Sequence, residues 1–273
     1  MELTIKDLEL VVNDQNKTLY SSIYDIILLQ FEDALRNTDV GNLTEERKSA
    51  LGTCAIYLNS LVELLHTLRE LMDKGYIESG GAVATACWER AITLRKILIN
   101  PELNAQIHTD HELAKKTPWS IYDMVCDVLA NEGKVKKNGS KRPYEEKIFY
   151  LQYTFLSSIK HGNPHTISYL YRPGYSSDEK LFRFKPNDSF EDKDLKIYIK
   201  MIVADNALDA LIDYSKAFRT EHNVLKELSG QIDSLICEVE LDVPPILRTT
   251  PEEMTQDYWD HLVELGKKRK FSR

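Results

Sequence analysis

The residues of this chain that are best suited to chemistry lie in segment 143–165, which reads PYEEKIFYLQYTFLSSIKHGNPH. A helical period of 3.6 residues places four polar or aromatic side chains along one side of this segment: Tyr150, Thr154, Ser157 and His161. Pro143 and the two glutamates that follow predict a helix start, and Gly162 and Pro164 predict its end. His161 therefore falls in the last turn, where free carbonyl groups favour a protonated imidazole, and it is the first candidate for acid–base chemistry.

A second helix, predicted to follow the Ser79–Gly81 segment and to reach Asn100, carries charged residues among apolar ones. Glu89 and Arg90 lie in the run ACWERAITLRK, where an ionised side chain is costly unless it is paired. A structural ion pair, or an arginine whose head group reaches solvent, would account for them. The alternative is a shared polar pocket in which Glu89 or Arg90 meets the polar side of the first helix.

Length and composition indicate one main domain. With 273 residues, of which 42% are hydrophobic, the chain can bury a large core. Its four cysteines are far apart in apolar helical contexts, which predicts neither a disulfide framework nor a zinc knuckle and favours the cytoplasm. We find no apolar run of membrane-spanning length and an N-terminus too acidic for a signal peptide, so no membrane association is expected.

The net charge of −8 argues against broad, nonspecific binding of nucleic acid. Two local basic segments remain as candidate binding surfaces. One is a glycine-containing loop that leads into the Pro143 helix and includes Lys137, Lys141 and Arg142, and the other is the tail at 267–273. A solvated loop and a frayed tail are the alternatives for the two segments.

Helical periodicity dominates the rest of the chain. We expect helices over about 6–37, from Thr44 to near Gly75, from Thr117 to about Asn131, over about 191–228, and after Thr250. Residues 166–185 instead have period-two and aromatic character around a Pro–Gly turn, which predicts a short β-hairpin or flap. The predicted fold class is therefore all-α: a helical bundle over residues 1–230 with this insertion, followed by a helical extension with a basic tail at 231–273.

No metal or cofactor site is predicted. His108, His111 and Glu112 lack a second cluster that would complete a metal site, and the Glu63, His66 pair lacks the second copy that a di-iron bundle needs. The sequence also contains no glycine-rich phosphate loop, nucleophile elbow or dinucleotide fingerprint. These absences argue against kinases, dehydrogenases and hydrolases of the usual folds.

The two helices together resemble a family of uncharacterised bacterial helical proteins known only as a domain of unknown function. The residues that carry the resemblance are Trp88 and Glu89 in one helix, and Ser157, His161 and Gly162 at the end of the other. That family is in turn similar to the HEPN superfamily of helical nucleases and nucleotide-binding domains. The resemblance covers roughly residues 45–220 when compared helix by helix. It implies a HEPN-like helical bundle.

The resemblance also implies metal-independent cleavage of RNA by a homodimer, in a bacterial toxin–antitoxin or phage-defence system. His161 would move protons between the RNA 2′-hydroxyl and the leaving oxygen. Lys160 or Arg90 would supply the positive charge that stabilises the phosphorane, and Glu89 is a further candidate catalytic residue. Phosphate and imidazole would be oriented by Tyr150, Ser157 and Asn163.

A non-catalytic helical module that binds a protein or a nucleotide is the alternative, because fold does not determine function. Such a module would act as a sensor or partner in the same kind of system, with a protein encoded nearby. The two hypotheses differ in the surroundings of His161. An exposed ring beside a cation supports chemistry, whereas a sealed apolar setting supports a structural role.

Overall fold

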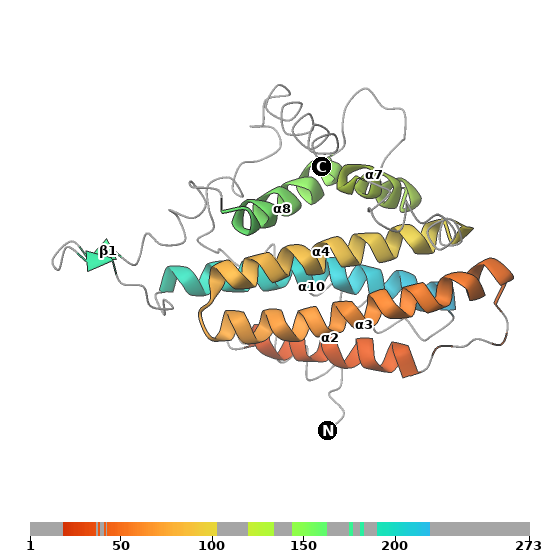
Figure 1. Cartoon of the computed structure of the whole chain (residues 1–273), viewed down its shortest axis with the longest axis horizontal. Helices are drawn as coiled ribbons and strands as arrows, with labels where there is room; N and C mark the ends of the chain where they lie inside the picture. Colours follow the sequence, from red (N-terminus) through yellow and green to blue (C-terminus); the bar gives the residue numbers. More distant parts are fainter. Residues whose placement is uncertain are drawn as a thin grey trace.

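The computed structural model describes residues 19–36, 38, 41, 43–102, 120–133, 144–162, 175–176, 181–182 and 190–218. This part of the chain contains six helices (Figure 1): α2 (Leu19–Arg36), α3 (Glu45–Asp73), α4 (Ile77–Ile99), α7 (Ile121–Asn131), α8 (Tyr144–Lys160) and α10 (Phe190–Phe218). The prediction of an all-α fold is confirmed for these residues.

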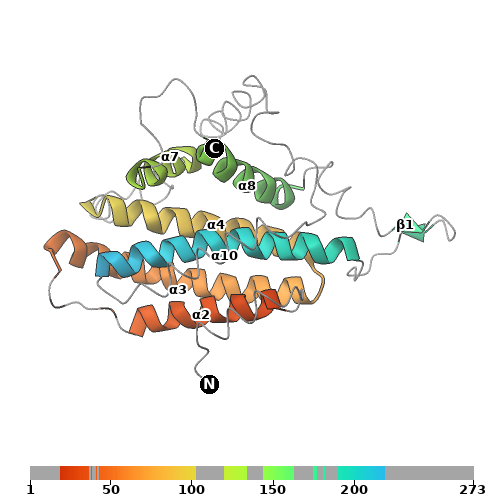
Figure 2. The ribbon, with the colours of Figure 1, turned by 180° about the vertical axis from the view of Figure 1, so that it is seen from behind.

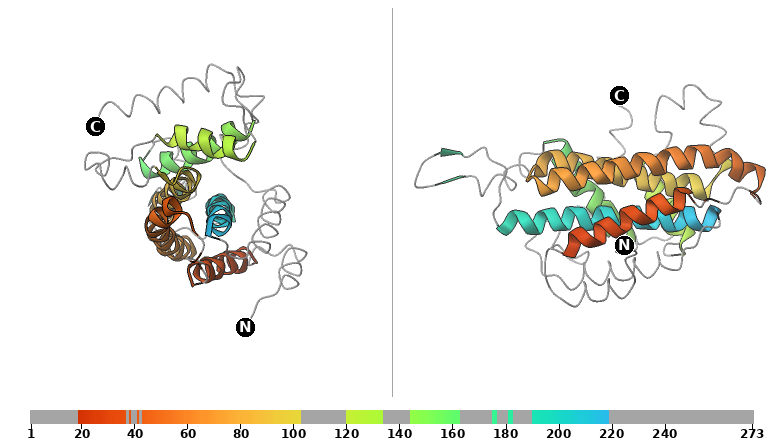
Figure 3. Two further views of the ribbon diagram at one scale, coloured as in Figure 1. Left: turned by 90° about the vertical axis from the view of Figure 1, so that its right-hand side faces the viewer. Right: turned by 90° about the horizontal axis from the view of Figure 1, so that it is seen from below.

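Helix α4 lies at the centre of the molecule. It packs against α3 and α10 on one side and against α7 and α8 on the other. Seen from both faces, α2, α3, α4 and α10 run side by side, and the α7–α8 pair lies along α4 on the side away from α3 and α2 (Figures 1 and 2). The end-on view shows α2 and the α7–α8 pair at opposite ends of the stack (Figure 3, left). The buried side chains of α4 therefore face either α3 and α10 or the α7–α8 pair, according to their position around the helix, while Glu78, Ser79 and Arg90 are exposed.

Local sequence signals fix several helix ends. The Thr44 hydroxyl accepts a hydrogen bond from the Arg47 amide at 3.4 Å and starts α3, as predicted. Gly75 follows the C-terminal end of α3 and has a φ of 83°, a left-handed conformation that favours glycine. The predicted break at Ser79–Gly81 is wrong, because α4 starts at Ile77 and contains these residues. Ser120 rather than Thr117 starts α7, since its hydroxyl accepts from the Asp123 amide at 3.1 Å.

The two glycines in the first turns of α4 allow close helix packing. A Cβ atom on Gly80 would lie 2.6 Å from Cε of Met72 in α3, and one on Gly81 would lie 2.5 Å from Cγ2 of Ile159 in α8. Real side chains do not approach this closely, so the contact with the branched Ile159 needs glycine at 81, whereas at 80 the flexible end of Met72 would have to move. The sequence signal that looks like a break is therefore a point where α3 and α8 pack closely against α4.

The buried core is apolar and continuous. Helix α3 contributes one face, with Leu58, Leu61, Leu65 and Leu68 each fully buried. Within the described residues, α3 is also long and apolar enough to cross a membrane by length and composition, which differs from our expectation that no such run exists. A single helix of this kind is weak evidence for a membrane span, because core helices of soluble proteins meet the same criteria.

Outside the helices, Tyr175 pairs with Phe182 and Ser176 with Leu181 in a two-residue antiparallel ladder, β1 (Tyr175–Ser176) and β2 (Leu181–Phe182). The other residues of the predicted flap at 166–185 lie outside the described part, so a flap stays a prediction. The same holds for the first half of the predicted helix at 6–37, for the end of the helix at 191–228, and for the extension at 231–273.

Candidate functional site

The contact between α4 and α8 brings together aromatic side chains from both helices. The Trp88 indole, which is fully buried, lies between two rings of α8, with centroid distances of 5.4 Å to Phe149 and 5.3 Å to Tyr153. Tyr150 meets Tyr122 of α7 edge to face at 5.6 Å. These contacts fix the rotation of α8 and so decide which of its side chains face α4.

Polar groups of both helices meet at Glu89, next to this aromatic contact. One carboxylate oxygen of Glu89, Oε1, accepts a hydrogen bond from the Tyr153 hydroxyl at 3.3 Å. The same oxygen lies 3.4 Å from Nζ of Lys160, with side chains 36% and 33% exposed for Lys160 and Glu89. We refer to Glu89, Tyr153 and Lys160 as the Glu89 cluster. It combines an anion, a phenol and a cation at a position that solvent can reach.

Burial raises the pKa of Tyr153 to about 12, and the negative charge of Glu89 acts in the same direction. A hydrogen bond with Ser157 lowers the pKa of Tyr153 and only partly offsets these effects. The phenol therefore remains protonated at neutral pH. It acts as a hydrogen-bond donor that holds the Glu89 carboxylate in place.

His161 follows Lys160 directly and is exposed at the end of α8. Its backbone amide donates to the Ser157 carbonyl at 3.0 Å, and the Gly162 amide donates to the Ile159 carbonyl at 3.1 Å. Gly162 has a φ of 61°, which is the left-handed conformation typical of a helix end. The predicted end of this helix is thus confirmed, and the His161 ring is not sealed in an apolar setting.

The other predicted site residues have separate places. Arg90 is exposed and its guanidinium lies 5.2 Å from the ring centroid of Tyr57 in α3, so the structure does not bring it to the Glu89 cluster. Tyr150 and Ser157 are buried, with 5% and 6% of their surface exposed. Both contact Tyr153 of the Glu89 cluster, Tyr150 through its ring and Ser157 through a hydrogen bond. Four predicted residues lie outside the described part of the chain: Asn163, Lys137, Lys141 and Arg142.

Sequence reasoning missed Tyr153 and chose Tyr150 in its place. The available signal is the spacing of Tyr153 and Lys160, which are seven residues, or two helical turns, apart and so lie on the same side of α8 as each other. Their common partner on α4 is Glu89. An ion pair is one of the alternatives that the sequence leaves open for Glu89, and its partner in the structure is Lys160.

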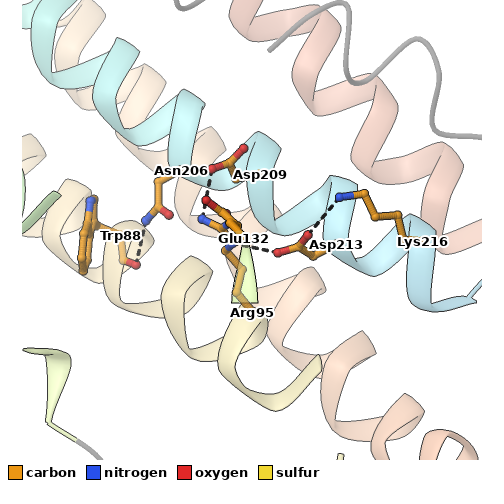
Figure 4. A network of polar contacts seen from close by, with 7 residues as sticks. All are labelled: Trp88, Arg95, Glu132, Asn206, Asp209, Asp213 and Lys216. Carbon is orange, nitrogen blue, oxygen red and sulfur yellow. Dashed lines mark hydrogen bonds and ion pairs between the residues drawn. The ribbon is translucent and has the colours of Figure 1, made fainter. Parts of the chain in front are cut away.

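A second polar network lies deeper, where α4 meets α7 and α10 (Figure 4). Its centre is Arg95, whose side chain is 1% exposed. Nη1 of Arg95 lies 3.0 Å from Asp209 Oδ2, and Nε lies 2.9 Å from Asp213 Oδ2. Glu132, at the end of α7, forms a third ion pair with Arg95. One buried guanidinium thus connects three carboxylates from two helices to α4.

Further polar contacts extend this connection in both directions along α4. Lys96, also buried, forms an ion pair with Asp127 of α7. The side-chain amide of Asn206 in α10 donates a hydrogen bond to the Trp88 carbonyl at 3.2 Å. Figure 4 shows this bond to one side of Arg95. Because these groups are occupied with one another between helices, we interpret them as structural. Among the described residues, no group of three or more His, Cys, Asp or Glu side chains is placed to hold a metal ion.

Searches against protein-family models, curated proteins and solved structures give no match to this chain. The resemblance to HEPN-like proteins therefore rests on the residues quoted above.

Proposed function

We propose that the protein is a metal-independent ribonuclease, with His161 and the Glu89 cluster as its active site. The observation that supports this proposal is the exposed position of His161 at the end of α8, one residue after Lys160, whose ammonium group is held by Glu89. Cleavage of RNA through its own 2′-hydroxyl can proceed with an imidazole that moves the proton and a cation that stabilises the charged phosphorane. The HEPN resemblance extends the proposal to a bacterial toxin–antitoxin or phage-defence system.

In this proposal His161 accepts the proton of the RNA 2′-hydroxyl as that oxygen attacks the adjacent phosphorus. The same proton is then available for the leaving 5′-oxygen, so the products are a 2′,3′-cyclic phosphate and a 5′-hydroxyl. Lys160 stabilises the negative charge that develops on the phosphorane oxygens. Glu89 positions Lys160, and Tyr153 positions Glu89.

The remaining predicted residues have supporting roles. Arg90 has no part in the reaction, because its side chain lies against α3. Ser157 acts through Tyr153 and through its carbonyl contact with the His161 amide, and Tyr150 acts by packing. The loop with Lys137, Lys141 and Arg142 leads into α8 and would bind the RNA backbone, with Asn163 near the scissile phosphate.

A non-catalytic binding module remains the second candidate, since one observation favours it. The ion pair between Lys160 and Glu89 already neutralises the cation and ties α8 to α4. In that case the Glu89 cluster is a clamp between helices, and His161 only ends α8.

Cleavage assays on purified protein distinguish the two candidates. Wild-type protein should cleave total RNA and single-stranded oligoribonucleotides in the presence of a chelator, and a 2′-deoxy substitution at the cleaved position should block the reaction. His161→Ala should lower the rate by about 10²-fold or more without a change in melting temperature. The matched control is His66→Ala, because His66 is an exposed histidine on α3, away from the site.

Equal cleavage by wild type and His161→Ala, or no cleavage of any RNA by the wild type, would refute the ribonuclease. A clear fall in melting temperature for His161→Ala, together with absent cleavage, would support the structural role.

A further inference from the structure

The middle of the outer face of α3 carries few charges for a protein surface. Between Lys48 and Arg69 the sequence has one Asp, Glu, Lys or Arg residue, Glu63, whereas such residues make up 29% of the whole chain. Only 33% of the most apolar 18-residue window of this helix is buried. Ile56, at its middle, is 67% exposed. Ile56 is the one large apolar side chain of α3 that is exposed, and its position in a stretch with so little charge points to a contact with another molecule.

Gly52, one turn before Ile56, points to the same conclusion by a different route. It is exposed, and a Cβ atom added to it would meet nothing within 4 Å. Its φ is not in the left-handed region, in contrast to Gly75 and Gly133. Glycine inside a helix costs about 0.5–1 kcal/mol relative to alanine. Since neither packing nor backbone geometry within the described chain calls for glycine here, the space above it suits a neighbour from outside.

The exposed residues of this face follow each other at helical spacing and form what we call the α3 stripe: Glu45, Lys48, Gly52, Ile56, Asn59, Glu63 and His66. We infer that the α3 stripe binds the α3 stripe of a second copy of this chain. The two helices would run antiparallel, with a twofold axis beside Ala55 and Ile56. At about 1.5 Å per residue the stripe is roughly 30 Å long, which is enough for a helix pair of several turns.

Charge complementarity selects a second copy in this orientation. Around the proposed axis, residues at equal distances in opposite directions meet across the interface. Lys48, whose Nζ lies 2.8 Å from Glu45 Oε1 of its own chain, then also faces Glu63 of the second copy, and Glu45 faces His66. Gly52 faces Asn59, whose side chain fills the space that the glycine leaves. A parallel pair would place Lys48 against Lys48 and Glu63 against Glu63, which is unfavourable.

This interface is independent of the proposed function. Helices α3 and α8 lie against different sides of α4 (Figure 3), so the α3 stripe pairs without covering the Glu89 cluster. It also differs from a pairing of the two α8 helices across a cleft, which the HEPN resemblance would imply. The outcome of a ribonuclease assay therefore neither supports nor refutes it.

Light scattering and sedimentation equilibrium on the full-length protein test the inference. Wild-type protein should have twice the chain mass of 31.5 kDa. Ile56→Glu and Gly52→Leu should each weaken the dimer at least about tenfold, and circular dichroism should show unchanged helix content because both positions have open space in the monomer. The matched control is Leu29→Glu on α2, which changes another exposed apolar residue, 49% exposed and outside the stripe.

Charge reversal tests the orientation. Lys48→Glu and Glu63→Lys should each weaken the dimer by roughly tenfold, and the double variant should restore it, because both contacts are then reversed. A monomeric wild type at the highest soluble concentration would overturn the inference, as would a Leu29→Glu variant that dissociates as fully as Ile56→Glu. Binding of the monomer to neutral phosphatidylcholine vesicles, abolished by Ile56→Glu, would also overturn it by assigning the face to a membrane.

Discussion

Replacing Arg95 with methionine should be among the most destabilising single changes in this protein. Methionine keeps much of the side-chain length but removes the guanidinium that three carboxylates share. Those carboxylates cannot move fully into water, since the side chains of Glu132, Asp209 and Asp213 are only 21%, 26% and 20% exposed. Removing one partner of a buried ion pair costs about 3–5 kcal/mol, and partial access to solvent places this case toward the lower end.

We therefore expect Arg95→Met to lose about 3–4 kcal/mol of unfolding free energy, out of a total of about 5–15 kcal/mol for a typical protein. The melting temperature should fall by roughly 6–15 °C. Urea denaturation followed by circular dichroism measures the first quantity, and scanning calorimetry measures the second. Adding Asp209→Asn to Arg95→Met should recover part of the loss, because one unpaired carboxylate is then removed.

Lys216→Met is the matched control. Lys216 is 49% exposed and lies 3.5 Å from Asp213, so its ion pair is a surface pair and should contribute less than about 1 kcal/mol. The unfolding free energy of Lys216→Met should lie within about 1 kcal/mol of the wild-type value. If that of Arg95→Met also lies within about 1 kcal/mol of it, the network does not hold α7 and α10 to α4.

Two further predictions concern the contact between α4 and α8. Gly81→Ala should destabilise the fold by about 1–3 kcal/mol in urea titrations, because its Cβ would meet Ile159 Cγ2 at 2.5 Å, and Ile159→Ala in the same chain should relieve part of this loss. Tyr153→Phe should reduce the loss of unfolding free energy that occurs as the pH rises from about 10 to 12. The reason is that the folded chain keeps the Tyr153 proton up to a pKa of about 12, whereas the unfolded chain releases it near pH 10. Stability from the neutral phenol is therefore complete below pH 10 and is lost as the pH rises. An unchanged pH dependence in unfolding titrations would contradict this assignment.

Much of the helical architecture was predictable because its signals are local. Thr44 caps α3 with its own hydroxyl, and Gly162 ends α8 by its own backbone conformation, so a short stretch of sequence suffices in both cases. The error at Ser79–Gly81 has a different cause. Glycine also occurs where another helix comes close, and only the positions of Met72 and Ile159 show that this is the reason here.

The candidate site was predictable in its parts and less so in its pairing. Sequence indicated that Glu89 needs a cationic partner and that His161 lies at a helix end. It did not show that Arg90, the neighbour of Glu89, turns toward Tyr57 while Lys160 approaches from α8, because the rotation of α8 depends on how its rings pack around Trp88. Arg95 was overlooked for a similar reason, since its carboxylates come from elements more than 30 residues away in sequence.

The central position of α4 has a consequence for how the molecule opens. The α7–α8 pair makes its main contacts with α4 and within itself, whereas α2, α3 and α10 also contact one another. Amide hydrogens of α7 and α8 can therefore exchange with solvent through a partial opening that leaves the other four helices assembled. Those of α4 have no such route, and they become accessible only when the whole domain unfolds.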